Sequence, residues 1–473
     1  MRFERGFLAL IVLGAALAAL PAVGQPRAPR LELLDAGDLG GEPRMPALAG
    51  GVWNREPLIL GVEPDLDRTV LYRLAWLERG AAPNLPGPDR PRQGETAGAD
   101  APELQDVLEG TVATGSAGPA RGDVAPAAGR PQPIALEPGL PEIVPFEPLP
   151  PGVDSVALAG SVRDGLLAWV AREGSPEVPL YRLAARRFAV HGKPAGGDLT
   201  LQVGPGRPAD LAVAVAPDGE ALIAWTNHLA GRGAALHWRS VGHGGEIGAL
   251  RRQWDIASDQ GSPSVAVLPG GFALAHLETP LQGQPPEPLE GGDDEVAGRG
   301  PDRALRIRKV SAGDASPRGE ASTVAQRPGL DHPQVRSRGG AAHVFWTDPR
   351  GGGRMLRSRA VGSDAVPAGA DFALRTDLRA SEPEPFRVLP AADGLWLVVW
   401  PQLEGRGRAM VLQARLFHGA GNAVGPPALV GRSGGDLALR DVVESRGADR
   451  WIAVWTEEEA GRFRLRYRPL LLK

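Results

Sequence analysis

Oxygen-bearing side chains recur two positions after a repeated tryptophan, and no other residues of the chain are better placed to do chemistry. Seven apolar segments share this pattern, and in six of them the second residue beyond the tryptophan position is a carboxylate or an amide. The seven positions are Glu63, Ala171, Asn227, Glu278, Asp348, Gln402 and Glu457. Carboxylate and amide oxygens can hold a cation, hydrogen-bond a sugar or receive a basic side chain. A fold that gathers these positions on one side would create a polar binding ring.

Two neighbouring residues could join this ring. Arg350 follows Asp348 in the segment HVFWTDPRGG and could clamp an anion, and His228 directly follows Asn227. We therefore predict a binding face composed of Glu63, Asn227, His228, Glu278, Asp348, Arg350, Gln402 and Glu457. The alternative is that these side chains cap loops and hydrogen-bond local amides. No feature separates a proton donor from a nucleophile among them, so we assign no catalytic residue.

Motifs that would identify a reaction or a cofactor are absent from the sequence. The eight histidines show no H-E-x-x-H or H-x-x-E-H spacing, and no G-x-S-x-G, Walker or dinucleotide-binding pattern occurs. The absence of cysteine excludes disulfides, thiolate metal sites and cysteine nucleophiles. We therefore expect neither a metal site nor a cofactor.

The tryptophans themselves mark a repeat. Apolar segments end at Trp169, Trp225, Trp346, Trp400 and Trp455, while His276 and Gly61 occupy the same position in two further copies. From Trp169 onward most spacings lie close to 54 residues, and the long exception contains an insertion after His276. A fixed period of this length indicates a repeat architecture. We predict that the five tryptophans are structural residues that pack between neighbouring repeats.

Other elements recur around each tryptophan segment. A Gly-rich turn and an earlier apolar segment precede it, and an apolar-x-x-Arg-x-apolar segment follows it. The arginines of that following segment are Arg73, Arg182, Arg239, Arg308, Arg359, Arg415 and Arg468. We expect each to pair with an acidic side chain or a carbonyl within its own repeat. With a weak fourth segment, each unit of about 50 residues has the four antiparallel strands of a propeller blade.

These repeats predict an all-β fold, a β-propeller of seven four-stranded blades. Six blades are the alternative, because the unit around Gly61 is the least regular copy. The last unit ends at Lys473 after only three strands. We predict that residues 30–36, RLELLDA, supply its missing outer strand and so close the ring.

Composition defines the remaining domains. Arg2 and Arg5 precede the apolar run at residues 7–20, and small residues follow, so residues 1–24 are predicted to be a secretory signal peptide. Residues 25–80 would hold the closing strand and the first blade, and residues 151–473 the other blades. Residues 81–150, rich in proline, glycine and alanine, are predicted to be a disordered insert.

The repeats also resemble those of secreted bacterial β-propeller proteins. The pattern is P-x-V, a glycine turn, L-V-V-W-x-D-x-R-x-G and an arginine strand. Two good copies are HPQVRSRGGAAHVFWTDPRGGGRMLRSRAV and PEPFRVLPAADGLWLVVWPQLEGRGRAMVLQARLF. The resemblance covers residues 152–473 and, in a less regular copy, residues 46–79, and it implies a propeller fold. The chain is distantly similar to sialidase-type propellers as well, but their S-x-D-x-G-x-x-W turn motif is absent.

We therefore expect an exported, non-catalytic binding or scaffolding protein, periplasmic or secreted and monomeric, that recognises a protein or a glycan through its loop face. A formal net charge of −4 gives no reason to expect nucleic acid as a partner. One alternative is a carbohydrate-active enzyme, hydrolase or lyase, using carboxylates near the propeller axis. Two carboxylates about 5–10 Å apart there would favour it. Another is a structural part of an envelope assembly, with residues 81–150 as an arm ordered by its partner.

Overall fold

The computed structural model describes the chain in segments. They are residues 29–33, 37–38, 48–53, 56–63, 68–73, 76–78, 136–138, 142–144, 149–150, 152–161, 164–175, 177–189, 194–229, 233–255, 258–281, 302–350, 353–374, 386–404, 409–444, 449–459 and 462–473. For the strands between residues 37 and 144 only the backbone is described. The chain forms two units, Met1–Ala75 with Leu140–Lys473, and Trp76–Gly139. The predicted signal peptide lies outside the described residues.

The described chain is built of antiparallel strands, which confirms the predicted all-β class. Its only helical element is the short 3-10 turn at Ala392–Gly394. No helix in the segments given above is long and apolar enough to cross a membrane. In the smaller unit, β6 (Trp76–Glu78) pairs with β7 (Leu136–Pro138).

The larger unit contains six four-stranded sheets and one sheet completed from both ends of the chain. The four-stranded sheets are β3 (Leu48–Trp53), β4 (Glu56–Glu63), β5 (Arg68–Arg73) and β8 (Glu142–Val144); β9 (Val153–Gly160), β10 (Gly165–Gly174), β11 (Pro179–Phe188) and β12 (Leu199–Gly204); β13 (Arg207–Val215), β14 (Ala221–Leu229), β15 (Gly233–Val241) and β16 (Arg251–Gln253); β17 (Ser258–Leu268), β18 (Gly271–Pro280), β19 (Asp302–Ser311) and β20 (Pro317–Pro328); β21 (Asp331–Arg338), β22 (Ala341–Arg350), β23 (Gly353–Val361) and β24 (Pro367–Leu374); β25 (Arg387–Pro390), β26 (Leu395–Leu403), β27 (Met410–His418) and β28 (Ala423–Ser433). The last sheet has β29 (Leu437–Glu444), β30 (Arg450–Glu459) and β31 (Arg462–Leu472), with β1 (Leu31–Leu33) and β2 (Gly37–Asp38) both on β31.

Local sequence explains these hairpins. In the sheets whose side chains are described, the second strand is an apolar run, such as LLAWVA in β10, and most of it is buried on both faces. Glycine-containing turns join the first strand to the second; Gly219 after Pro-Asp has a φ of +91°, which favours glycine. The observed turn therefore agrees with the Gly-rich turn predicted before this tryptophan segment.

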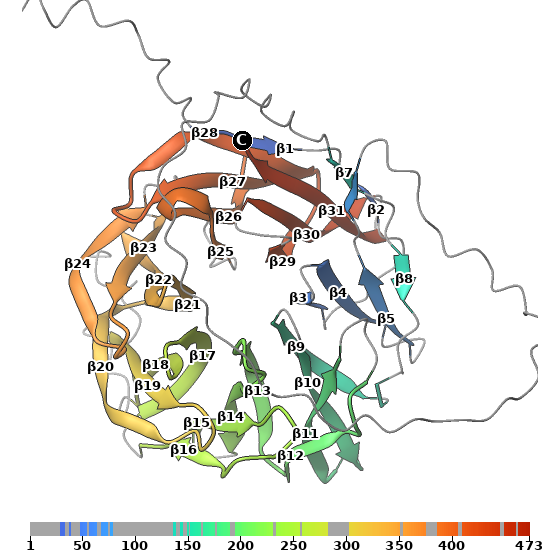
Figure 1. Cartoon of the computed structure of the whole chain (residues 1–473), viewed down its shortest axis with the longest axis vertical. Coiled ribbons are helices and arrows are strands. Elements are labelled where there is room, and N and C mark those ends of the chain that lie inside the picture. Colours follow the sequence, from blue (N-terminus) through green and yellow to red (C-terminus); the bar gives the residue numbers. More distant parts are fainter. Residues whose placement is uncertain are drawn as a thin grey trace, which may run out of the picture. The chain divides into compact units, whose positions relative to one another are not determined.

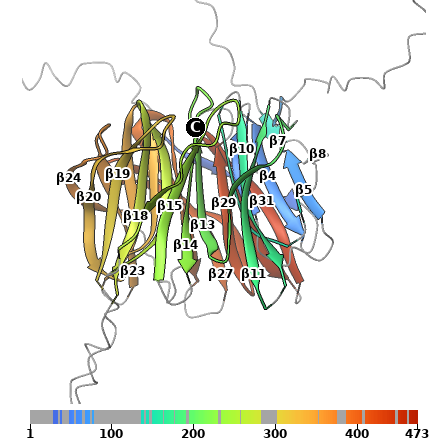
Figure 2. The same cartoon turned by 90° about the horizontal axis from the view of Figure 1, so that it is seen from below.

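The sheets stand around a common axis with their first strands innermost (Figure 1). The inner strands β9, β13, β17, β21, β25 and β29 contact one another in that order, and β3 contacts both β29 and β9. Figure 2, turned by 90°, shows strands of neighbouring sheets running side by side along this axis. The larger unit therefore has a β-propeller-like fold.

The two ends of the described chain meet in one sheet. Leu31 pairs with Leu472 and Leu33 with Leu470, and backbone hydrogen bonds join Arg30 and Lys473. An ion pair between Lys473 and Glu32 adds to this junction. The prediction that residues 30–36 supply the outer strand of the last unit is confirmed at Leu31–Leu33.

The region predicted to be a disordered insert contains strands at its C-terminal end. Residues 136–138 form β7, and residues 142–144 form β8, the outer strand of the sheet that holds β3–β5. The segment EIV of β8 lies among prolines and has only two apolar residues, so no strand pattern is visible there in the sequence. The boundary at residue 150 is therefore too late by at least these strands. Residues 79–135 lie outside the described part of the chain.

The repeated tryptophans lie in apolar clusters that join neighbouring sheets. Trp225 of β14 packs with Leu166 and Val170 of β10, and Trp455 of β30 packs with Leu412 and Val430 of the sheet before it. Trp346 and Trp400 occupy similar clusters, whereas the cluster of Trp169 contains residues of its own sheet and Leu149; all three are at most 3% exposed. Burying one such ring stabilises the fold by about 2–3 kcal/mol.

A substitution at Gly431 tests this packing between sheets. A Cβ at Gly431 of β28 would lie 2.9 Å from two ring carbons of Trp455. We expect Gly431→Ala to lower the free energy of unfolding by about 1–3 kcal/mol, because the buried ring must shift. Urea denaturation measures the change. Gly434→Ala is the matched control, since no atom lies within 4 Å of its Cβ position. Equal stability of the two variants would contradict close packing at Trp455.

Candidate functional site

The polar residues predicted to form a binding face lie near the ends of second strands. Asn227, Glu278, Asp348, Gln402 and Glu457 belong to β14, β18, β22, β26 and β30 respectively. Glu63 is the last residue of β4 and Arg350 the last of β22, but their side chains lie outside the described part of the structure. The loops that follow these strands are also mostly outside it.

Gln402 and Glu457 accept hydrogen bonds from the tryptophans of their own strands. Trp400 Nε1 donates to Gln402 Oε1 at 3.2 Å, and Trp455 Nε1 donates to Glu457 Oε2 at 3.1 Å. Residues two apart on a strand point to the same face, which explains why tryptophan and polar residue recur at this spacing. These oxygens therefore satisfy indole N–H groups that are largely removed from water.

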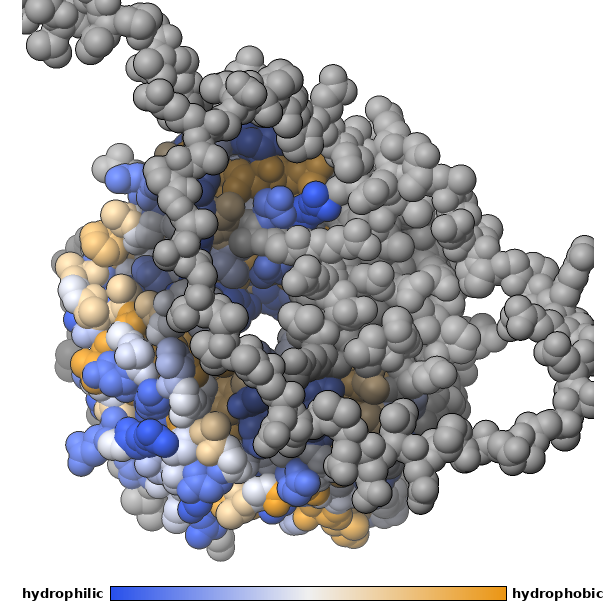
Figure 3. Space-filling view, in the orientation of Figure 1, coloured by the Kyte–Doolittle hydropathy of each residue, from blue (hydrophilic) through white to orange (hydrophobic). Residues whose placement is uncertain are grey.

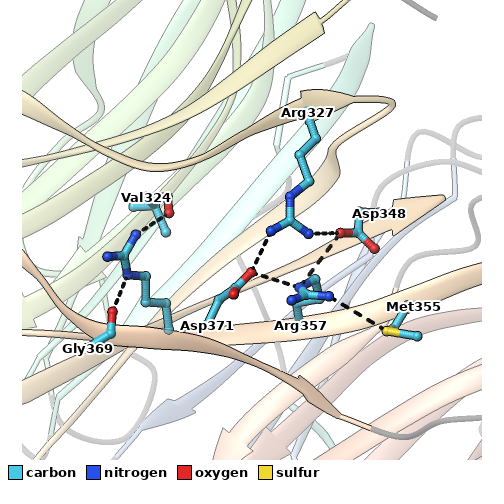
Figure 4. A network of polar contacts seen from close by, with 8 residues as sticks. Val324, Arg327, Asp348, Met355, Arg357, Gly369 and Asp371 are labelled. Atoms are coloured by element: carbon cyan, nitrogen blue, oxygen red, sulfur yellow. Dashed lines mark hydrogen bonds and ion pairs between the residues drawn. The ribbon is translucent and has the colours of Figure 1, made fainter. Parts of the chain in front are cut away.

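Arginines of the third strands hold the carboxylates. Arg466 Nε lies 2.8 Å from Glu457 Oε1, and Arg306 Nε lies 2.9 Å from Glu278 Oε2. Asp348 is 1% exposed and lies 2.7 Å from Arg327 and 3.7 Å from Arg357 (Figure 4). These three carboxylates are thus engaged within the protein.

Asn227 and His228 differ from each other despite being adjacent. Asn227 is 4% exposed, and its Oδ1 accepts a hydrogen bond from Gln202 Nε2 at 3.3 Å. His228 is exposed. The contacts found for the described residues of the predicted face are therefore hydrogen bonds and ion pairs within the protein. The role of these residues in binding stays a prediction.

The arginines that pair with these carboxylates are not the ones predicted from the repeat. The predicted residues are Arg308, Arg359 and Arg468, whereas the partners of Glu278, Asp348 and Glu457 include Arg306, Arg357 and Arg466, two residues earlier. The recurring triplets R-I-R, R-S-R and R-Y-R carry this signal. The first arginine of each triplet holds the carboxylate of its own sheet.

The second arginines of two triplets, Arg359 and Arg468, reach carbonyl groups of outer strands, but the predicted partner within the same repeat is found only for Arg359. Arg359 donates to Gly369 O of its own sheet at 3.0 Å and to Val324 O of the preceding sheet at 2.7 Å. Arg468 donates to Val430 O of the preceding sheet at 2.6 Å. These arginines link adjacent sheets.

A cavity of about 690 Å³ runs along the axis, and we call it the channel. Its described walls come from the inner strands β9, β13, β17, β21, β25 and β29. Figure 3 shows an opening near the middle of the view. The charged residues among the lining residues are Arg336, Arg387, Asp441 and Glu444, all on β21, β25 and β29.

Hydrogen bonds and an ion pair organise the charged wall. Arg387 Nε lies 3.1 Å from Asp441 Oδ1, which also accepts the Val442 backbone N–H at 2.9 Å. Arg336 donates to Val388 O at 2.7 Å. Both guanidinium groups thereby connect one inner strand to the next.

Burial alters the ionisation of two channel residues. Burial, followed by repulsion from Arg387, lowers the pKa of Arg336 to about 10. Burial and the nearby charge of Asp449 raise the pKa of Glu444. Arg336 therefore stays charged at neutral pH, while Glu444 takes up a proton more readily than an exposed glutamate.

A second cavity of about 690 Å³, which we call the hollow, lies at the turns between first and second strands. Pro217, Pro269, Leu268, Val267 and Phe272 are among its lining residues, and it shares Gly160 and Ser161 with the channel. Each second strand begins at these turns and ends near the predicted polar face. The hollow and that face are therefore at opposite ends of the strands.

No group of three or more potential metal-ligating side chains occurs in the segments that the structure describes. No protein-family model matches the chain, and no curated protein matches it. Solved structures similar to it include a protein of unknown function from Dyadobacter fermentans, with 13% identity, a TM-score of 0.42, and coverage of 67% of this chain and 94% of that one.

Two enzymes are also similar at low identity. Trypanosoma rangeli sialidase in complex with sialic acid has 12% identity and a TM-score of 0.39, over 70% of this chain and 55% of the sialidase. The endo-arabinase from Bacteroides thetaiotaomicron has 10% identity and a TM-score of 0.33, over 56% of this chain and 95% of the arabinase. Likeness at this level assigns no activity to the chain.

Proposed function

We propose that this protein is an exported, non-catalytic binding or scaffolding β-propeller of seven blades that recognises a protein or a glycan. The basic and apolar N-terminus supports export. The order of contacts among the inner strands, β3 included, supports seven blades. The hollow at one axial end is the single observation that most supports binding.

The hollow has the composition of a recognition site. Pro217 and Pro269 are exposed at the tips of two hairpins, and Val267 is half-buried beside them. Apolar side chains that converge on a concave surface gain free energy when a partner removes them from water. Several blades contribute to this surface, so a folded propeller would be needed to form it.

The state of Asp441 favours a non-catalytic role. Its Oδ1 receives both the Arg387 guanidinium and the Val442 backbone amide. A carboxylate held in this way acts as a structural counter-ion, whereas a nucleophile or a general base must be able to reach its substrate.

One observation favours a carbohydrate-active enzyme as the second candidate. Glu444 lies in the same channel as Asp441, and burial raises its pKa as expected for a general acid. Release of sugar from a glycan by the purified protein, and its loss in Glu444→Gln, would select this alternative.

Charged substitutions in the hollow test the proposed function. We expect Pro217→Glu and Pro269→Glu to weaken partner capture by about tenfold or more, because a carboxylate placed there must be desolvated on binding. Binding is measured by glycan array and by pull-down from envelope extracts, followed by titration with the captured partner. Val366→Glu is the control, since Val366 is 48% exposed and does not line the hollow. Equal capture by all three variants would rule out the hollow as the recognition surface.

A further inference from the structure

The two described walls of the channel differ in chemistry. β9, β13 and β17 contribute no charged residue to the lining, whereas β21, β25 and β29 contribute all four. Apolar lining residues of the first wall are Val156, Leu158, Leu211, Val213 and Val265. Strand β3, which contacts both β29 and β9, has the uncharged sequence LAGGVW. The channel thus joins an apolar arc to a charged arc.

The apolar arc is incompletely covered. Val156, Leu158, Leu211 and Val213 are only partly buried, although each also packs against a core cluster. Contact between apolar surface and water is unfavourable. An apolar ligand that covered this surface would gain about 25 cal/mol for each Å² removed from water.

The charged arc contains one arginine without a carboxylate partner among the described residues. Arg387 is paired with Asp441, but the hydrogen bonds of Arg336 go to neutral oxygens, namely Val388 O, Val335 O at 3.0 Å and Gln334 Oε1 at 3.2 Å. These use three of the five N–H groups of a guanidinium. In the described part of the chain no carboxylate contacts Arg336, so an anion could bind its remaining donors.

The carboxylate of Glu444 does not occupy these donors. No hydrogen bond or ion pair joins Glu444 to Arg336 among the described residues, and burial, followed by the charge of Asp449, raises the pKa of Glu444. The remaining guanidinium donors of Arg336 therefore favour an anionic group over a cationic one.

We propose that the channel binds a small organic anion with an apolar body. The apolar body would lie along β9, β13 and β17, and the anionic group would receive hydrogen bonds from Arg336. A volume of about 690 Å³ fits this class, because small-molecule sites measure roughly 300–1,000 Å³. The proposal goes beyond partner recognition at the hollow, since it assigns a separate ligand to the interior.

Charge selectivity in the wild-type protein gives the first test. The probe is 8-anilinonaphthalene-1-sulfonate, whose fluorescence rises in an apolar site, and competitors are dodecanoate and dodecyltrimethylammonium. These competitors have the same chain length and opposite charge. We expect dodecanoate to displace the probe at a concentration at least about tenfold lower than dodecyltrimethylammonium requires. Equal displacement by both, or no displacement, would overturn the proposal.

Matched arginine variants give the second test. Arg336→Gln is expected to weaken dodecanoate displacement by about tenfold, because a charge-assisted hydrogen bond is lost. Arg359→Gln is the control. Arg359 on β23 also donates to a carbonyl of a neighbouring sheet, Val324 O at 2.7 Å, but it lines neither the channel nor the hollow. Unchanged displacement in folded Arg336→Gln, or equal losses in both variants, would contradict the proposal.

The two sites can be separated experimentally. Pro269→Glu should reduce partner capture at the hollow and leave dodecanoate displacement unchanged. Arg336→Gln should weaken dodecanoate displacement and leave partner capture unchanged. If Arg336→Gln does not fold, the charge selectivity of the wild-type protein still decides the proposal. Partner capture without anion selectivity would leave the proposed function standing and reject the channel ligand.

Discussion

Asp348→Ala is expected to lower the free energy of unfolding by about 3 kcal/mol, because it removes a buried carboxylate and leaves Asp371 alone to balance Arg327 and Arg357. The Asp348 side chain is 1% exposed, and that of Arg357 is 9% exposed. Arg327 Nη1 lies 2.7 Å from Asp348 Oδ2. Truncation therefore removes the most buried carboxylate of an ion network, with little water available to replace it.

This network explains why the effect should extend beyond one sheet. Arg327 belongs to β20, the outer strand of one sheet, and it contacts Asp348 on β22 and Asp371 on β24 of the next (Figure 4). Arg357 on β23 lies 2.9 Å from Asp371. Burial opposes ionisation of Asp371, but Arg357 and Arg327 outweigh it and lower its pKa. Two carboxylates and two arginines thus alternate across the boundary between the sheets.

Urea denaturation at neutral pH measures the effect of Asp348→Ala. Asp371→Ala is the matched control, and we expect a smaller loss because its side chain is 23% exposed. In the double variant with Arg327→Met, the two losses should be less than additive, since the residues contact each other. A loss below about 1 kcal/mol for Asp348→Ala would show that the network contributes little.

The same variant separates a structural role for Asp348 from a binding role. The sequence predicts that Asp348 belongs to a binding face, where its removal would weaken binding and leave the fold intact. Its burial and its contacts with Arg327 and Arg357 instead predict that folding is affected first. Reduced binding by a variant of unchanged stability would favour the original prediction.

Acidification is expected to destabilise the protein through His276. This residue occupies a tryptophan position in the repeat, is fully buried on β18, and has no hydrogen-bond partner for either ring nitrogen among the described residues. Burial, with the nearby charges of Arg308 and Arg306, lowers its pKa to about 3. The folded protein therefore holds the ring neutral under conditions in which an exposed histidine is protonated.

The direction of this pH effect follows from the difference in the pKa of His276 between the folded and unfolded states. An unfolded histidine has a pKa of about 6.5, so below this pH the unfolded chain binds a proton that the folded chain resists. The stabilising contribution of neutral His276 is therefore complete above about pH 6.5 and falls by about 1.4 kcal/mol for each unit down to about pH 3. The loss by pH 3.5 is about 4 kcal/mol.

Comparing His276→Leu with the wild type isolates this contribution. The variant should be close to wild type at neutral pH, because no hydrogen bond is removed, and relatively more stable as the pH falls. Urea denaturation between about pH 7 and pH 4 supplies both curves. Other buried histidines add to the acid sensitivity of both proteins; burial lowers the pKa of His237 to about 4. The exposed His228→Leu serves as the control, and parallel pH curves for wild type and His276→Leu would refute the prediction.

Much of the fold could be predicted because its signals are local and periodic. The recurring tryptophan segments reflect strands buried between sheets, and the Pro-Asp-Gly turn reflects a backbone that favours glycine at Gly219. The closing pair of β1 and β31 was predictable from a missing strand and an apolar segment at the other end of the chain. Strand β8 was not, because a short segment among prolines carries no alternation.

The candidate site was less predictable because it depends on register and on contacts between sheets. The sequence shows that Asp348 and Glu457 occupy a recurrent polar position. Their environment, however, depends on which arginine of the neighbouring third strand lies beside them. Trp346 pairs with Arg357 across β22 and β23, and Trp455 pairs with Arg466 across β30 and β31. This register places the first arginine of each triplet beside the carboxylate. A shift of one residue would have sent it to the other face.

By itself, the sequence determined the all-β class, the length of the repeat, the strands that carry tryptophan and the segment that closes the last sheet. Each of these follows from local patterns of apolar residues, glycine turns and spacing. Only the tertiary structure decided that Asp348 is buried in an ion network, and that Arg336, Arg387, Asp441 and Glu444 line one channel. These residues come together because separate inner strands meet around an axis, and a linear pattern does not encode which side chains then face one another.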